Sequence, residues 1–223
     1  MKEQEILAKR INLVRQKIDQ AKQKFGITYD IKIIAATKAK SPKTINLLYE
    51  CGIKAIGENR VQEFLRKYPE LNKNFEMHFI GQLQSNKVKY IIDKISLIHS
   101  LDRISLAQEI DKRAKNIGKI MDALIEVNLG EASKGGVLAE EVLGFYGQMS
   151  NYPNIRVRGI MSVMPIDAPD DKYLQMRELY DILKTQSKDI KYLSMGMSDD
   201  YLKAIEHGAN MIRLGRVILG ERI

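Results

Sequence analysis

The sequence has little that would support disulfide or membrane-anchored chemistry. Its 223 residues include one cysteine, Cys51, so an intramolecular disulfide is excluded and a reducing cytoplasm is the simplest location. No apolar run approaches the roughly 18–20 residues that a membrane-spanning helix needs. Proline is scarce, with 5 residues, and we find no low-complexity or linker-like segment. These absences favour one globular domain over residues 1–223.

The charges do not gather into a single basic surface. The formal net charge is +8, which would permit anionic ligands or nucleic acid. However, lysines and arginines are dispersed and acidic residues lie among them. A solvated basic surface is the simpler interpretation. We therefore expect no nucleic-acid partner and keep such a module as the weakest alternative.

The first 26 residues predict an amphipathic helix rather than a signal peptide. Charges occur throughout this segment, and it has no unbroken apolar core. Its apolar residues recur at spacings of three and four, which places them on one face of a helix. These residues are Leu7, Ile11, Val14, Ile18, Ala21 and Phe25. We expect residues 1–26 to pack on the domain, and we expect no membrane partner.

The rest of the chain alternates short apolar strands with amphipathic helical stretches. The predicted strands are 31–37, 55–59, 77–81, 97–101, 122–128, 156–163, 192–196 and 211–215. The helical stretches are 41–51, 60–71, 85–95, 102–118, 139–150, 170–188 and 198–208. This alternation implies parallel strands with right-handed crossovers.

Eight such strands predict an α/β fold, a single closed (β/α)8 TIM barrel with an extra N-terminal helix. An open doubly wound sheet is the alternative. The first strand is not followed by G-x-G-x-x-G, which weakens a dinucleotide-binding interpretation.

Functional groups of such barrels gather where the strands end at their carboxyl side. Small polar and basic groups occur at these positions, without a pair of carboxylates or a Cys/His cluster with metal-ligand spacing. The residues are Lys38, Asn59, Gly81, Gln82, Ser100, Asn128, Ser162, Ser198, Arg213, Leu214 and Gly215. We therefore expect no metal site.

Lys38 is the most informative of these residues. It directly follows the buried strand 31–37. Partial desolvation at the mouth of an apolar barrel would lower the pKa of its amine and favour the neutral form. A neutral lysine amine can form a Schiff base with an aldehyde. The alternative is a lysine that extends into solvent beyond the strand end.

The C-terminal segment 193–222 contains a candidate phosphate site. Ser198 precedes a predicted helix, where its hydroxyl either caps that helix or contacts a phosphate. Gly215 follows the last strand, and Arg216 is a further candidate anion contact. Phosphate sites of barrels often use the loops after the seventh and eighth strands. Arg213 lies inside the last strand, where it pairs with a carboxylate such as Glu58 or Glu126 or contacts a ligand.

Eight segments together resemble the pyridoxal phosphate homeostasis proteins, which are similar to the N-terminal barrel of alanine racemase and of eukaryotic ornithine decarboxylase. The segments are "AATK" (35–38), "GENRVQE" (57–63), "HFIGQLQSNK" (78–87), "IHSLD" (98–102), "EVNLGEASKGG" (126–136), "RGIMSVMP" (158–165), "LSMGMSDD" (193–200) and "IRLGRVILGER" (212–222). As a set, in this order and over nearly the whole chain, they are highly specific.

The resemblance implies a site for pyridoxal 5′-phosphate, held as a Schiff base on Lys38. It implies that Ser198 and the backbone around Gly215 and Arg216 hold the phosphate. Arg213 would face the pyridine nitrogen, and Asn59 would lie beside the cofactor. Many members have Ser or Thr at the position of Arg216, so a side-chain hydroxyl contact is not expected there.

The resemblance also implies intracellular cofactor homeostasis, with apoenzymes that use pyridoxal phosphate as candidate partners. We expect little catalytic turnover, because an arginine at the pyridine nitrogen does not protonate it and the ring then stabilises a carbanion less. The second domain of alanine racemase, which supplies a catalytic tyrosine and dimer contacts, has no counterpart after Gly215, so we also expect a monomer. A racemase-like pyridoxal enzyme and a Schiff-base aldolase remain the enzymatic alternatives.

Overall fold

The computed structural model describes residues 3–130 and 135–220. Within this part of the chain, nine parallel strands form one sheet. They are β1 Lys32–Ala36, β2 Ala55–Glu58, β3 Glu76–Phe79, β4 Leu97–Leu101, β5 Met121–Asn128, β6 Val137–Leu138, β7 Ile155–Met161, β8 Tyr192–Ser194 and β9 Met211–Leu214. Residues 131–134 of the segment 126–136, and residues 221 and 222 of the segment 212–222, lie outside the described residues.

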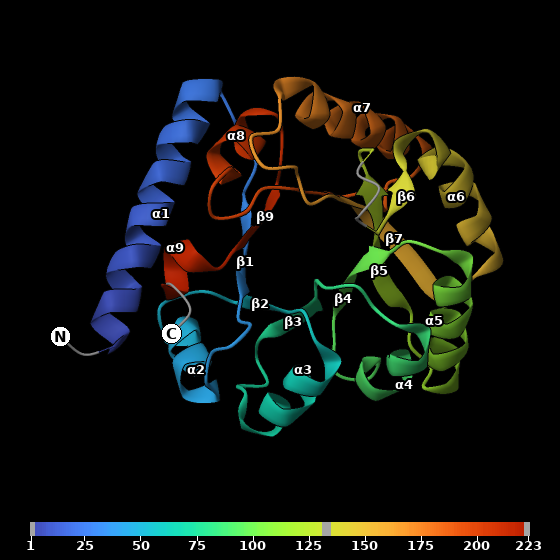
Figure 1. Ribbon diagram of the computed structural model, residues 1–223, viewed down its shortest axis with the longest axis horizontal. Helices are drawn as coiled ribbons and strands as arrows, with labels where there is room; N and C mark the ends of the chain where they lie inside the picture. Colours follow the sequence, from blue (N-terminus) through green and yellow to red (C-terminus); the bar gives the residue numbers. More distant parts are fainter. Residues whose placement is uncertain (1–2, 131–134, 221–223) are drawn as a thin grey trace.

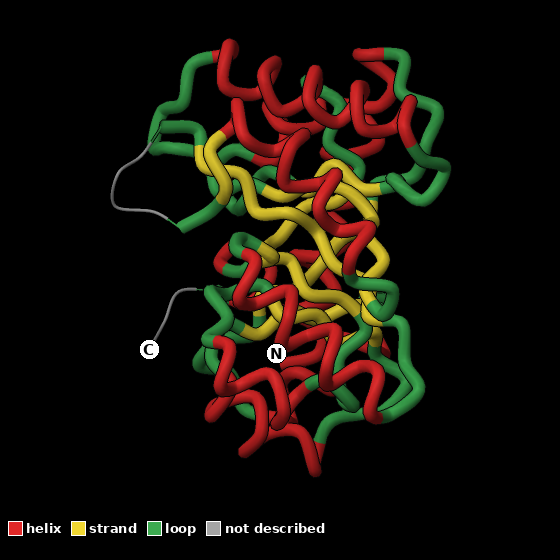
Figure 2. The backbone as a smooth tube through the Cα atoms, turned by 90° about the vertical axis from the view of Figure 1, so that its right-hand side faces the viewer, coloured by secondary structure: helices red, strands yellow, loops and turns green. Residues whose placement is uncertain are grey.

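The sheet closes into the predicted (β/α)8 barrel. Its strand order is β4-β3-β2-β1-β9-β8-β7-β5, and β5 pairs with β4 to complete the ring. The short strand β6 lies outside the ring on β5. In Figure 2 the strands occupy the centre of the molecule and helices cover the outside. The open-sheet alternative is therefore wrong.

Helices connect the strands over the outside of the barrel (Figure 1). They are α1 Glu3–Phe25, α2 Pro42–Glu50, α3 Val61–Lys67, α4 Val88–Ile91, α5 Ile104–Asn116, α6 Val142–Gln148, α7 Asp170–Gln186, α8 Tyr201–Glu206 and α9 Arg216–Leu219. Single 3-10 turns precede α4 and α6 and follow α3 and α6. None of the helices in the described ranges is long and apolar enough to cross a bilayer.

The eight predicted strands all occur, with ends that differ from the prediction by at most two residues. The sequence pattern did not predict β6 or α9, because two and four residues are too short to show a hydrophobic period. Ser41 caps α2 as expected, since its side chain accepts a hydrogen bond from the Thr44 amide and Pro42 begins the helix.

The N-terminal helix α1 packs on the barrel through the predicted apolar face. Leu7, Ile11, Val14, Ile18 and Ala21 are buried along it. The helix contacts α2, α8 and α9, and Figure 1 shows it beside these three elements. Because α8 and α9 are the last two helices, α1 joins the beginning of the described chain to its end.

The barrel interior combines apolar side chains with a few buried polar groups. Ile34, Leu97 and Leu124 belong to an apolar cluster that the strands enclose. His78 Nδ1 and His99 Nε2 lie 3.0 Å apart inside this barrel. Burial lowers the pKa of both imidazoles, so both rings are neutral near neutral pH.

Candidate functional site

A cavity of about 430 Å³ opens at the carboxyl ends of β1 and β9. Five of the six residues predicted to bind the cofactor line it: Lys38, Ser198, Arg213, Gly215 and Arg216. The sixth, Asn59, follows β2 next to this end of the barrel, but it is not among the lining residues. We call this space the strand-end cavity.

Lys38 lies in a tight turn directly after β1. The Lys40 amide donates to the Thr37 carbonyl at 3.2 Å, which closes a four-residue turn over residues 37–40, the Lys38 turn. Ala39 has φ of 61°, in the left-handed region that favours glycine. The Lys38 side chain is exposed, whereas the sequence led us to expect partial desolvation.

Three residues on β2 and α3 support the Lys38 turn. Lys67 is buried and donates to the Thr37 carbonyl at 2.9 Å, to Glu58 at 2.9 Å and to Glu63 at 2.6 Å. Of the two carboxylates offered as alternative partners of Arg213, Glu58 does not pair with it, because Glu58 accepts hydrogen bonds from Lys67 and from Thr37 Oγ1. Sequence reasoning missed Lys67 and Glu63 as residues of the site.

The other wall of the cavity presents backbone amides. Ser198 Oγ accepts hydrogen bonds from the Gly215 amide at 3.2 Å and from the Val217 amide at 3.3 Å. These amides lie at the start of α9, so Ser198 caps α9 and not α8, the helix that the sequence suggested. Both amides are satisfied by the Ser198 oxygen, whereas the Ser198 hydroxyl proton remains to be donated, so an anion seated here would accept from the hydroxyl and would share the two amides with Ser198. We call these three groups the anion cup.

The Ser198 loop is held in place by the residues around it. Asp200 Oδ1 accepts from the Met197 amide at 2.7 Å, and its Oδ2 accepts from the Tyr173 hydroxyl at 2.9 Å. At Gly196, φ is 95° and a Cβ would come within 2.7 Å of the Ala204 Cβ, so only glycine fits this position. Arg216 pairs with Asp199 at the exposed rim of the cavity.

Arg213 is buried in β9 and reaches the floor of the cavity. Its guanidinium donates to the Ser194 carbonyl at 3.0 Å, to Ser194 Oγ at 2.8 Å and to the Ser162 carbonyl at 2.8 Å. Burial lowers the pKa of Arg213 to about 10, although Asp200 and Glu126 oppose this shift. Arg213 therefore remains a cation at neutral pH and is fixed by neutral oxygens of Ser194 on β8 and of Ser162 directly after β7.

The carboxyl group of Glu126 also lies in the barrel interior, where it interacts electrostatically with Arg213. Burial raises the pKa of Glu126 on β5 to about 7; the charge of Asp102 adds to this shift and that of Arg213 opposes it. Glu126 Oε2 is buried, and within the described residues it has no hydrogen-bond partner. Glu126 thus carries a proton for much of the time at neutral pH.

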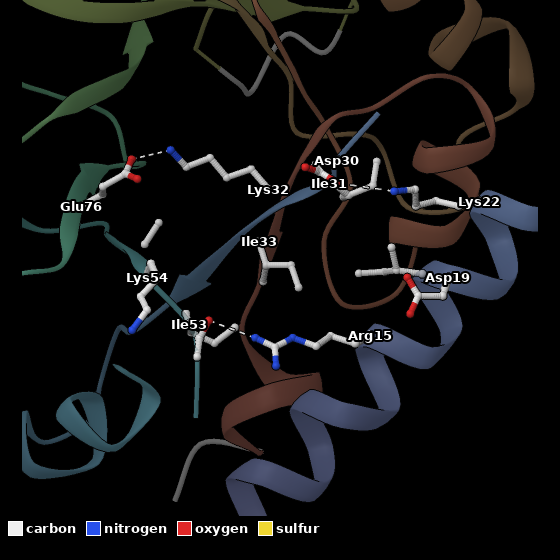
Figure 3. Close-up of a pocket in the computed structure, with 13 residues that line it drawn as sticks. Arg15, Asp19, Lys22, Asp30, Ile31, Lys32, Ile33, Ile53, Lys54 and Glu76 are labelled. Atoms are coloured by element: carbon white, nitrogen blue, oxygen red, sulfur yellow. Dashed lines mark hydrogen bonds and ion pairs between the residues drawn. The ribbon is translucent and has the colours of Figure 1, made fainter. Parts of the chain in front are cut away.

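A further cavity of about 450 Å³ lies at the opposite end of the barrel, between α1 and the first residues of β1 to β3 (Figure 3). Four of its charged residues form two ion pairs, Lys32 with Glu76 and Lys22 with Asp30. Arg15 donates to the Gly52 carbonyl at 2.9 Å. We assign no ligand to it.

Comparisons with known proteins relate the whole barrel to one family. Residues 10–222 match the model of the alanine racemase N-terminal domain. A pyridoxal phosphate homeostasis protein of Aquifex aeolicus is 43% identical over 221 residues, which cover 96% of this chain and 97% of that protein. One of Helicobacter pylori is 36% identical, covering 95% of this chain and 97% of that protein.

Solved structures agree with this relationship. The structure of PipY from Synechococcus elongatus with PLP bound has a TM-score of 0.83 and 28% identity, and covers 96% of this chain and all (100%) of that one. Alanine racemase of Corynebacterium glutamicum shares the fold, with a TM-score of 0.77 and 14% identity over 98% of this chain and 61% of that one. This chain therefore belongs to the alanine racemase N-terminal domain family and, within it, to the pyridoxal phosphate homeostasis proteins.

Proposed function

We propose that this protein binds pyridoxal 5′-phosphate, holds it as a Schiff base on Lys38 and serves in intracellular cofactor homeostasis. The observation that carries this proposal is the strand-end cavity. Lys38, Arg213 and Ser198 all line this one cavity, and Ser198 accepts from the amides at the start of α9. A ligand that carries both an aldehyde and a phosphate would use both the lysine amine and the anion site at Ser198.

The residues fit the two ends of such a ligand. The Ser198 hydroxyl and the Gly215 and Val217 amides would hold the phosphate, with Arg216 as an added cation that would have to share its charge with Asp199. Lys38 Nζ would bond to the aldehyde carbon, forming C=N while the carbonyl oxygen leaves as water. Arg213 would face the pyridine nitrogen, and Asn59 would lie beside the ring.

The cation at Arg213 favours storage over turnover. When bound, the cofactor supplies an electron sink, and this sink is strongest when its ring nitrogen is protonated. Arg213 is a permanent donor held by three hydrogen bonds, so it cannot deliver a proton to that nitrogen at neutral pH. We infer a cytoplasmic monomer that exchanges cofactor with apoenzymes and has little activity of its own.

The test is an absorbance spectrum of the purified protein, repeated on Lys38→Ala and on the control Lys40→Ala, which changes a second lysine of the same cavity. We expect a visible imine band in the wild type and in the control, and its loss in Lys38→Ala. A visible band that persists in Lys38→Ala would refute attachment at this residue.

A second measurement separates carrier from enzyme. The holoprotein is incubated with individual L-amino acids, and chiral chromatography follows their inversion. We expect bound cofactor without inversion. Multiple turnovers per site would instead favour the racemase-like enzyme, which is the main alternative function because alanine racemase shares the barrel fold.

A further inference from the structure

We propose that Glu63 and Lys67 are positioning residues that lock the Lys38 turn so that the Lys38 amine is presented to the strand-end cavity. This inference rests on the proposed function, because it assigns these two α3 residues a part in covalent attachment. Neither residue lines the cavity, so their effect would act through the turn.

The turn adopts a conformation that its sequence does not favour. Turns with positive φ at the third residue usually have glycine there. In the Lys38 turn this residue is Ala39, with φ of 61°. The left-handed conformation is sterically strained for an alanine, and such strain persists only where surrounding contacts impose the conformation. Contacts outside the turn must therefore hold it.

Glu63 supplies one of these contacts. Its Oε1 accepts a hydrogen bond from the Ala39 amide at 2.6 Å, directly at the strained residue. The same oxygen accepts from Lys67 Nζ at 2.6 Å. Although partial burial raises the pKa of Glu63, the hydrogen bonds from Lys67 and the Ala39 amide bring it below its usual value. A carboxylate is a stronger acceptor than a neutral group, so the bond to the turn is charge-assisted.

Lys67 supplies the second contact, at the other side of the turn. Its buried ammonium donates to the Thr37 carbonyl, the same oxygen that accepts from the Lys40 amide. Its two other hydrogen bonds go to Glu58 and Glu63. All three donors of the ammonium are thus used, which gives the side chain one defined position.

The two contacts bracket Lys38. Thr37, the residue before it, is held by Lys67 and by its own hydroxyl bond to Glu58 at 2.6 Å. Ala39, the residue after it, is held by Glu63. A fixed backbone on both sides limits where the Lys38 amine can move, which raises the fraction of time that it faces a bound aldehyde. The hydrogen bonds of Glu63 and Lys67 to the turn do not involve Ser198, Gly215 or Val217, which form the proposed phosphate site.

The test compares two ligands in wild type and Glu63→Gln. Pyridoxine 5′-phosphate has the ring and phosphate but no aldehyde, so its affinity reports the non-covalent contacts to the phosphate and the ring without the link to Lys38. Pyridoxal 5′-phosphate can also form the imine with Lys38, and stopped-flow absorbance at the imine band measures the rate of this step. We expect unchanged affinity for the first ligand and about tenfold slower imine formation with the second.

Glu109→Gln is the matched control. Glu109 accepts from Arg113 at 2.6 Å in an i,i+4 pair on α5, just as Glu63 pairs with Lys67 on α3. The two glutamate side chains are similarly exposed, at 23% and 18%. The control should match the wild type for both ligands.

Thr37→Val provides a second variant if Glu63→Gln does not fold. It removes the hydroxyl bond to Glu58 without removing a charge and should also slow imine formation. Wild-type rates in both variants, or an equal loss of affinity for both ligands, would overturn the inference. If the wild type itself forms no imine, the proposed function fails instead.

Discussion

At the scale of single residues, the barrel interior contains a carboxyl group that opposes folding at high pH. Glu126 lies on β5, and its buried Oε2 has no hydrogen-bond partner within the described residues. Burial raises its pKa to about 7, above the ordinary value of 4.5 that the unfolded chain would show. The folded state therefore retains a proton that the unfolded state releases.

This difference sets the sign of a pH effect. Between pH values near 4.5 and 7, stability falls as pH rises, because folding then requires Glu126 to take up a proton. The penalty is fully present above pH 7 and amounts to at most about 3 kcal/mol. We expect Glu126→Gln to be more stable than the wild type at about pH 8 and the gain to vanish near pH 4.5. Urea unfolding at several pH values measures it.

Glu109→Gln serves again as control, since Glu109 is on the outside of α5. A stability gain that is equal at all pH values would contradict the assignment of Glu126 as the titrating group.

At the scale of elements, the Ser198 loop and α9 form one unit. Ser198 Oγ joins the loop after β8 to the first amides of α9, and so connects two βα loops of the barrel. The proposed phosphate site depends on this connection, because the amides alone would not have a fixed position relative to the loop.

We expect Ser198→Ala to lower the free energy of unfolding by about 1 kcal/mol, the usual cost of a lost N-cap. The affinity for pyridoxine 5′-phosphate should fall about tenfold, because a hydrogen bond to a charged group is lost. Calorimetry measures both. Ser150→Ala, which removes an exposed hydroxyl bonded to the Gly147 carbonyl, is the control. Unchanged affinity in Ser198→Ala would argue against the cup.

Elements also show what the sequence could predict. Buried parallel strands are nearly continuous apolar runs, so β1 and β5 were readily predicted, and Lys38 was located as the residue after β1. The support of the Lys38 turn depends on contacts between α3, β2 and β1, which no local pattern encodes. One signal was present: Lys67 follows Val61 and Phe64 at helical spacing on the buried face of α3, where a charge needs a partner.

At the scale of the whole molecule, α1 packs on the outside of the barrel and connects helices from both ends of the described chain. It contacts α8, which follows the Ser198 loop, and α9, whose first amides bond to Ser198. Stability and ligand affinity should therefore be linked through α1, although none of its residues lines the strand-end cavity.

Ile11→Ala tests this link. Ile11 is fully buried in α1, so the substitution should cost about 2–5 kcal/mol of stability. We also expect weaker binding of pyridoxine 5′-phosphate, since the cup loses support behind α9. Leu13→Ala, on the same helix but 51% exposed, should change neither quantity. Thermal unfolding and calorimetry report the two effects, and an unstable variant with wild-type affinity would refute the link.

The pairing of β1 with β9 has a consequence for how the protein is made. The first barrel strand finds its neighbour only when the last one exists, so a chain emerging from the ribosome cannot seal the ring until β9 has been translated. Lys38 is synthesised long before Ser198, Gly215 and Val217, the residues of the anion cup. If Lys38 and the anion cup bind the cofactor as proposed, capture requires that β9 and the cup have been translated, and chains cleaved before β9 would not compete for the cofactor.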